Sequence, residues 1–234
     1  MSDSGPLIAA LVRHCDYRQL PDVPSAHQPF PLTETGRRQA REAAGLVREA
    51  IEDHGWSTLP GIDSSQLLRA WETARIIAAE PGPPAAPVET FDALAERGLG
   101  CAANLTVGQI EDIIRADPRF DAPPAGWKSA SHYRLPLQGA ESLMQAGRRV
   151  ADHLIRRIDE LRANGNHSGV KLFVGHGAAF RHAAFHLGVL DFGEISKFSM
   201  YHGRPVFLEA LPDGSWRHRA GKWKVRQRSE AFTD

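Results

Sequence analysis

Two histidines in this sequence each come directly after a short apolar run. His14 follows the run 7–12 and Arg13, and His176 follows the run 170–174. Apolar runs of this length are typical of strands buried inside a sheet. In an open α/β sheet, ligands bind at the carboxyl ends of the strands. Two imidazoles and a guanidinium group at that edge predict an anion site built around a histidine.

A phosphoryl group is an anion whose requirements this chain can meet. Its oxygens need several fixed donors, and guanidinium groups match them well. Covalent transfer also needs a nucleophile, such as a neutral imidazole, and an acid that protonates the leaving oxygen. The candidates are Arg13 and Arg69 for binding the phosphate, His14 or His176 for attack, and Glu96 for proton donation. Such a transfer depends on positioning and electrostatics and can proceed without a metal.

Strand and helix patterns alternate along the chain. Strands are expected at 7–12, 62–64, 87–90 and 170–174, and helices at about 33–53, 67–79, 107–116, 142–163 and 178–187, with a closing hairpin around 212–214. This alternation predicts a three-layer α/β/α fold with a central mixed, mostly parallel sheet. We expect one domain over residues 1–234, in which the irregular stretch 101–138 is a substrate cap inserted over the site.

Composition excludes several classes of protein. Lys+Arg and Asp+Glu balance at 28 each, so no overall field favours nucleic acid or an anionic membrane. Two cysteines, Cys15 and Cys101, cannot form a disulfide framework. No run is long enough for a membrane span, and the run 7–12 is too short for a signal peptide. We expect a cytoplasmic protein with a small-molecule substrate, and we interpret the basic stretch 216–228 as a solvated tail.

Five segments, in order along nearly the whole chain, resemble the motifs of the histidine phosphatase superfamily, which includes the cofactor-dependent phosphoglycerate mutases. They are Arg13-His14-Cys15, Leu32-Thr33-x-x-Gly36-x-x-Gln39-Ala40, Ser65-x-Leu67-x-Arg69-Ala70-x-x-Thr73-Ala74, Leu94-x-Glu96-Arg97-x-x-Gly100 and Gly175-His176-Gly177. The chain departs from the pattern in its first loop. Cys15 stands where the family has glycine, and Leu20 stands where it has asparagine.

The resemblance implies a phosphoglycerate mutase-like fold and a role for each candidate residue. His14 would be the nucleophile that becomes phosphohistidine, and Glu96 would be the general acid and base. The phosphoryl oxygens would be bound by Arg13, Arg69, His176 and Gly177. The implied function is metal-independent hydrolysis of phosphomonoesters without a cofactor. A phosphoglycerate-type phosphomutase and an inactive phosphatase-like scaffold are the alternatives.

Other residues invite a function but favour a structural interpretation. His182 and His186 have the i, i+4 spacing of metal ligands, yet no third ligand accompanies them, so packing is favoured. Arginine neighbours would lower the pKa of the Cys15 thiol and make it prone to oxidation, although two inert thiols are the favoured interpretation. Arg97 is expected to be solvated. In the expected cap, the residues proposed for substrate contact are Trp127, Lys128, His132, Tyr133 and Arg134.

Overall fold

The computed structural model describes residues 5–24, 26–82 and 87–226, which build a six-stranded sheet of order β3-β2-β4-β1-β6-β7. The strands are β1 (Leu7–Arg13), β2 (Thr58–Ser65), β3 (Val88–Phe91), β4 (Gly169–Gly175), β6 (Pro205–Ala210) and β7 (Trp216–Gly221), with a separate pair of β5 (Phe198–Ser199) and β8 (Lys224–Val225). The first four are parallel, and β6 and β7 are antiparallel. The predicted mixed, mostly parallel sheet is therefore confirmed.

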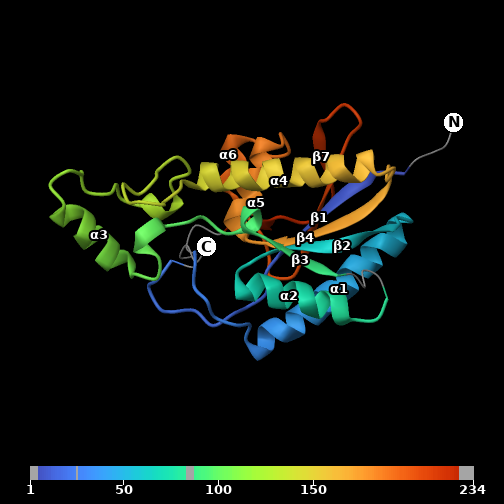
Figure 1. Cartoon of the computed structure of the whole chain (residues 1–234), viewed down its shortest axis with the longest axis horizontal. Helices are drawn as coiled ribbons and strands as arrows, with labels where there is room; N and C mark the ends of the chain where they lie inside the picture. The colour runs from blue at the N-terminus through green and yellow to red at the C-terminus, as the bar shows by residue number, and fades with distance from the viewer. Residues whose placement is uncertain (1–4, 25, 83–86, 227–234) are drawn as a thin grey trace.

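Helices cover both faces of this sheet (Figure 1). They are α1 (Glu34–His54), α2 (Leu68–Ala79), α3 (Val107–Ala116), α4 (Leu143–Ala163), α5 (Gly177–His186) and the short α6 (Phe192–Ile195). Figure 1 shows α1 and α2 on one face and α4 and α5 on the other, which makes three layers. Two of the long helices begin at side-chain caps, where Thr33 accepts from the Gly36 N–H and Ser142 from the Gln145 N–H.

The two sheet faces explain why β1 reads as a continuous apolar run. Ile8, Ala10 and Val12 pack with α1 and α2, whereas the residues between them pack with α4 and α5. Successive side chains of a strand point to opposite faces, so a strand covered on both sides needs an apolar residue at every position. The sequence of β1 is therefore a consequence of its central place.

The register of β1 against β4 brings the two histidine loops together. The pairing runs from Leu7 opposite Gly169 to Arg13 opposite Gly175, so both strands end at the same level. The His14 N–H then donates to the Gly175 carbonyl over 2.8 Å. Two loops that lie about 160 residues apart in the sequence thus meet at the carboxyl edge of the sheet.

The stretch between β3 and α4 has a small apolar cluster of its own. It contains the buried residues Leu99, Ala102, Ile110, Ile114, Trp127, Leu135 and Ala140, together with Ala26 from the loop after β1. Figure 1 shows α3 at one end of the molecule, away from the sheet. This part of the chain therefore folds around separate contacts and reaches the first loop through Ala26.

The C-terminal basic stretch contains a strand rather than being the tail that we predicted, although most of its described side chains are exposed to solvent as expected. Residues 216–221 form β7, which pairs antiparallel with β6 at the edge of the sheet. Glu209 of β6 holds two of its arginines, Arg217 over 2.9 Å and Arg219 over 3.7 Å. Arg228 lies outside the described residues. Among the residues that the structure describes, no helix is long and apolar enough to cross a membrane.

Candidate active site

His14 lies at the end of β1 and is only 3% exposed. Its Nδ1 is 2.9 Å from the Cys15 carbonyl oxygen. Because a carbonyl only accepts, Nδ1 carries the proton and the lone pair is on Nε2. Burial, and next to it the positive charge of Arg69, hold the pKa of His14 well below its usual value. His14 is therefore a neutral imidazole with a free electron pair on Nε2 at neutral pH.

His176 stands at the start of α5 with its ring centroid 5.1 Å from that of His14. Its Nδ1 is 3.3 Å from Nη2 of Arg69, and its Nε2 is 2.9 Å from Oγ of Ser65. A guanidinium group only donates, so Nδ1 accepts and Nε2–H donates to Ser65. Burial, followed by the charges of Arg69 and Arg13, lowers the pKa of His176 well below its usual value. A phosphoryl group that binds this ring must therefore replace one of its two present contacts.

Arg69 reaches the site from the first turn of α2 and is fully buried. Its guanidinium donates to the carbonyls of Gln28 (3.0 Å) and Ala26 (2.9 Å), and it lies 4.6 Å from the Tyr17 ring. These contacts tie α2 to the loop that follows β1. They fix a charged group beside both histidines, where its field keeps the imidazoles neutral.

Arg13 lies against the N-terminus of α5. Its Nη1 donates to the Met200 carbonyl over 3.0 Å. A Cβ added at Gly177 would lie 3.1 Å from the Arg13 Cδ, so glycine at this position gives the arginine side chain room. The two groups predicted to bind phosphate, the Arg13 guanidinium and the Gly177 backbone, are thus in contact at the helix N-terminus, which favours an anion.

Glu96 is buried near Arg69 at 6% exposure. Burial lowers the pKa of Arg69, and the charge of Glu96 is one of the effects that oppose this lowering. The Glu96 segment is fixed from α4, because Arg149 donates to the carbonyls of Asp92, Ala93 and Ala95 over 3.0 to 3.1 Å. Sequence reasoning missed Arg149, which has no motif of its own and acts on backbone carbonyls.

Arg97 is not solvated as we predicted. It is 5% exposed, and its guanidinium lies 5.8 Å from the Trp127 ring. Trp127 itself is 2% exposed and donates from Nε1 to Glu111 over 3.1 Å, which indicates a structural role. Burial lowers the pKa of Arg97, and the charge of Glu96 opposes that effect. Arg97 therefore connects the Glu96 segment to the stretch 101–138.

His202 is a third imidazole beside His14 that sequence reasoning missed. It lies in the loop between β5 and β6, with its ring centroid 5.4 Å from that of His14. The next residue anchors the loop, since the Gly203 N–H donates to the Arg13 carbonyl over 3.0 Å. The only sequence signal was a His-Gly pair before the apolar run 205–208. Tyr17 contacts the same His14 ring edge-on, at 5.2 Å.

The Cys15 side chain is buried with Tyr17, Leu32 and Ala40. Burial raises the pKa of this thiol to about 12, so the expectation that nearby arginines would lower it is wrong. Desolvation of the thiolate is the largest cause, the charges of Asp16 and Glu42 raise the pKa further, and a hydrogen bond with Thr73 opposes them. A Cβ added at Gly203 would lie 3.0 Å from the Cys15 Sγ, so the glycine leaves room for this side chain. Cys101, in contrast, is exposed.

The two histidines of α5 are packing residues, as the sequence favoured. His182 donates from Nδ1 to the Ala178 carbonyl (2.7 Å) and accepts on Nε2 from the Ser131 hydroxyl (3.0 Å). His186 donates to the Met144 carbonyl over 2.9 Å. Within the described residues, no three His, Cys, Asp or Glu side chains are grouped as a metal ion would require.

The other residues predicted for substrate contact differ in their surroundings. His132 is exposed, and its ring stacks on Phe192 at 5.3 Å. Arg134 is exposed, and Lys128 and Tyr133 are half-buried. None of these four is fully buried, in contrast to Trp127. They are therefore the members of the set whose side chains solvent reaches.

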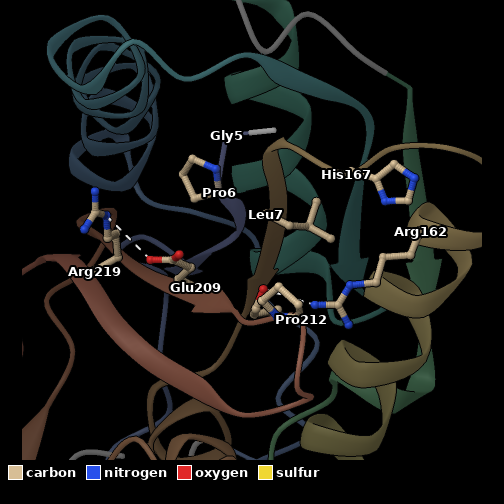
Figure 2. Close-up of a pocket in the computed structure, with 9 residues that line it drawn as sticks. Gly5, Pro6, Leu7, Arg162, His167, Glu209, Pro212 and Arg219 are labelled. Carbon is tan, nitrogen blue, oxygen red and sulfur yellow. Dashed lines mark hydrogen bonds and ion pairs between the residues drawn. The ribbon is translucent and has the colours of Figure 1, made fainter. Parts of the chain in front are cut away.

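A pocket lies at the amino-terminal edge of the sheet, opposite the edge that carries His14 and His176. Its lining includes Leu7, Arg162, Glu209 and Arg219, and its volume is about 590 Å³. Figure 2 shows Arg219 directed at Glu209, and Arg162 donates to the carbonyls of Ala210 and Leu211 over 3.1 and 2.8 Å. Its cations therefore already have partners within the chain. The histidines and arginines predicted for chemistry all lie at the other edge.

Comparison with known proteins agrees with this geometry. The sequence model of the histidine phosphatase superfamily (branch 1) matches residues 9–219. No curated protein sequence matches the chain.

Solved structures share the fold at 20% identity. The alignment with a putative alpha-ribazole-5'-P phosphatase from Escherichia coli has a TM-score of 0.65 and covers 94% of this chain and 96% of that protein. A mycobacterial glucosyl-3-phosphoglycerate phosphatase has a TM-score of 0.64 and covers 93% and 97%. The alpha-ribazole phosphatase from Shigella flexneri has a TM-score of 0.67 and covers 92% and 95%. Since the family match spans nearly the whole described structure, the chain belongs to branch 1 of the histidine phosphatase superfamily.

Proposed function

We propose that this protein is a metal-independent phosphatase that hydrolyses phosphomonoesters through a phosphohistidine on His14. The observation that carries the proposal is the state of this imidazole. Its Nδ1 proton is held by the Cys15 carbonyl, and burial with the neighbouring charges keeps the ring neutral. A buried neutral histidine among arginines has the nucleophile and the anion site that phosphoryl transfer needs.

In the first step, the His14 Nε2 lone pair attacks phosphorus and the bond from phosphorus to the ester oxygen breaks. The electron pair of that bond leaves with the oxygen, which takes a proton from the Glu96 carboxyl group and departs as an alcohol. Arg13, Arg69 and the Gly177 backbone N–H would bind the three remaining oxygens, and His176 would exchange a present contact for one of them. Charge that develops on these oxygens is then stabilised by groups already in place.

In the second step, water attacks phosphorus and the bond to Nε2 breaks. The Glu96 carboxylate takes the proton from this water, so it returns to the protonated state that the next cycle needs. Inorganic phosphate leaves and His14 regains its lone pair. The buried position of Glu96, at 6% exposure, supports a proton-transfer role at an enclosed site.

We further propose that the stretch 101–138 is a cap over the site within a single domain. Its own apolar cluster and its link through Arg97 to the Glu96 segment support this role. The exposed or half-buried residues Lys128, His132 and Arg134 are the ones proposed to contact substrate. The two structural neighbours named above as phosphatases of alpha-ribazole-5'-P and glucosyl-3-phosphoglycerate support a small phosphorylated molecule as substrate.

The test is hydrolysis of p-nitrophenyl phosphate in the presence of EDTA. We expect turnover by the wild type and a loss on the order of 10⁴-fold or more in His14→Ala, because the nucleophile is removed. A phosphoenzyme trapped from labelled substrate should be acid-labile and absent from His14→Ala. The matched control is His186→Ala, which removes a histidine whose Nε2 donates to the Met144 carbonyl and which we place outside the catalytic machinery.

Three results would contradict the proposal. Full turnover by His14→Ala would exclude His14 as the nucleophile. A wild type that hydrolyses no phosphomonoester would favour a phosphatase-like scaffold. Conversion of 3-phosphoglycerate to its isomer without release of phosphate would indicate a phosphomutase, which uses the same nucleophile but returns the phosphoryl group to the substrate.

A further inference from the structure

We propose that a cavity beside His14 binds a second anionic group of the substrate. The preferred substrate would then be a phosphomonoester whose alcohol part also carries a carboxylate or a second phosphate. The cavity has a volume of about 380 Å³ and lies between α1, the β5–β6 loop and β8. Its charged lining residues are Arg13, Glu42, Arg204 and Lys224, and His202 lies among them. The proposal rests on the phosphatase activity proposed above.

The cavity adjoins the phosphoryl site because the two share residues. Arg13 lines the cavity and also lies against Gly177 at the N-terminus of α5. His202 lines it as well, and its ring centroid is 5.4 Å from that of His14. The cavity and the phosphoryl site therefore adjoin at Arg13 and His202, and we propose that one small substrate reaches both.

The charge of the lining selects an anion. Two cationic side chains, Arg204 and Lys224, are opposed by the single carboxylate of Glu42, and Arg13, which we assign to the phosphoryl group, adds its positive charge at the boundary with the phosphoryl site. Guanidinium and ammonium groups bind carboxylates and phosphates with charge-assisted hydrogen bonds, which are stronger than neutral ones. The charged residues that line the cavity therefore fit a second anionic group of the substrate better than a neutral sugar hydroxyl.

The framework around the cavity holds these cations in place. The Gly203 N–H bonds to the Arg13 carbonyl over 3.0 Å, and the Arg13 guanidinium bonds to the Met200 carbonyl over 3.0 Å. Lys224 lies opposite Ser199 in the β5–β8 pair. The Arg204 guanidinium lies 5.5 Å from the Tyr201 ring. The loop that carries His202 and Arg204 is thus tied to the strand that carries the nucleophile.

The experiment compares two substrates with the same three-carbon skeleton. 3-Phosphoglycerate carries a carboxylate where glycerol 3-phosphate carries a hydroxymethyl group. We expect wild-type kcat/KM to favour 3-phosphoglycerate, and the double variant Arg204→Gln/Lys224→Gln to lower that preference about 10- to 100-fold, as for loss of charge-assisted bonds. The single variant Arg204→Lys keeps both positive charges, so we expect it to retain part of the preference that the double variant loses.

The matched control is Arg219→Gln, which removes one positive charge at the far edge of the sheet, where Arg219 pairs with Glu209. We expect this variant to keep the wild-type preference. An equal preference in the wild type and the double variant would overturn the proposal. So would an Arg219→Gln variant that loses the preference as strongly, because the effect would then come from overall charge.

Binding to the inactive His14→Ala variant separates this proposal from the proposed reaction. Calorimetry should show tighter binding of 3-phosphoglycerate than of glycerol 3-phosphate, and the double substitution should remove the difference. Tighter binding by His14→Ala, together with a wild type that hydrolyses neither compound, would overturn the phosphatase and keep the second-anion cavity. Turnover by the wild type, without any difference in binding between the two compounds, would overturn the second-anion cavity and keep the phosphatase.

A free anion in the cavity is the competing source of the same chemistry. Sulfate added to an assay with glycerol 3-phosphate distinguishes the two cases. We expect sulfate to compete with the substrate. Inhibition or activation that is not competitive, and that disappears in Arg204→Gln/Lys224→Gln, would show that the cavity takes a separate ligand and would overturn its assignment to the substrate.

Discussion

The fold holds two buried clusters of charged and titratable groups, and they differ in the group at their centre. In the first cluster, arginines lie around the neutral imidazole of His14. Burial and the charges of these arginines lower the pKa of this imidazole. In the other, Asp63 of β2 receives Arg157 at 2.7 Å, Lys171 at 2.8 Å and His153 at 3.0 Å. The Asp63 cluster is thus built on a carboxylate, and the His14 cluster is built on a base.

The difference separates a structural cluster from a reactive one. Burial alone would raise the pKa of Asp63, yet the hydrogen bonds from His153 and Arg157 and the charge of Lys171 bring it down to about 2. Arg156 donates to the His153 Nδ1 over 2.9 Å, and the His153 Nε2–H donates to Asp63 over 3.0 Å. Here the chain supplies the anion for its buried cations. The His14 cluster contains the Glu96 carboxylate near Arg69, and we propose that its arginines also bind the phosphoryl group of the substrate.

The largest expected effect in this comparison tests Glu96 of the His14 cluster, which we propose takes and gives a proton. Replacing it in Glu96→Gln should lower kcat by about 10²- to 10⁴-fold for an alkyl phosphate, whose leaving oxygen needs a proton. For p-nitrophenyl phosphate the loss should be much smaller, because its leaving group is already a weak base. Steady-state kinetics with both substrates measure this, and an equal loss for the two would exclude Glu96 as the general acid.

The next effect tests the Asp63 cluster. In Asp63→Ala, Arg157 and Lys171 would lose the anion between them, and we expect the free energy of unfolding to fall by about 3 to 5 kcal/mol. Urea denaturation measures this loss. Replacing Lys171 as well, in Asp63→Leu/Lys171→Met, should recover much of it, because apolar groups then fill the space. A fully stable Asp63→Ala would show that the cluster needs no internal anion.

A smaller effect distinguishes the clusters by pH. The lowered pKa of His14 means that the unfolded state takes up a proton first as the pH falls through about 6.5, so the native state loses stability below that value. Asp63, with a pKa of about 2 against 3.8, loses its contribution only between about pH 4 and pH 2.

The variant that tests this effect is His14→Asn, which removes one group that takes up a proton on unfolding. Below pH 6 its unfolding free energy should fall less steeply than that of the wild type, by up to about 1.4 kcal/mol per pH unit. Urea denaturation at several values between pH 7 and pH 5 gives both slopes. Equal slopes would mean that His14 is protonated in the folded protein.

The smallest effect concerns Cys15, which lies next to His14 but is governed by burial. With its thiol pKa raised to about 12, we expect mild peroxide to change activity by less than about twofold. Cys15→Ala should respond to peroxide as the wild type does. Inactivation by peroxide that a reductant reverses, and that Cys15→Ala abolishes, would show that the arginines near His14 activate this thiol.

The sequence by itself was sufficient where a residue's role follows from its neighbours along the chain. The apolar run of β1 predicted a buried strand, and Thr33 and Ser142 predicted helix starts that the structure confirms. Spacing and motif also selected His14, Arg69, His176 and Glu96. The strand and the helix starts could be predicted because strand burial and capping are local properties that one stretch of chain expresses alone, whereas the roles of the four selected residues stay predictions.

Only the tertiary structure decided which side chains meet and in what state. His202 and Arg149 reach the site from distant segments, and no local pattern predicts such a meeting. The Cys15 pKa and the burial of Arg97 went against expectation because desolvation depends on everything packed around a group. The proton position on His14 likewise depends on one carbonyl at 2.9 Å. The sequence thus selected the candidate groups, and the packing determined their neighbours, the lowered pKa of His14 and the position of its lone pair, on which the proposed role of His14 as nucleophile depends.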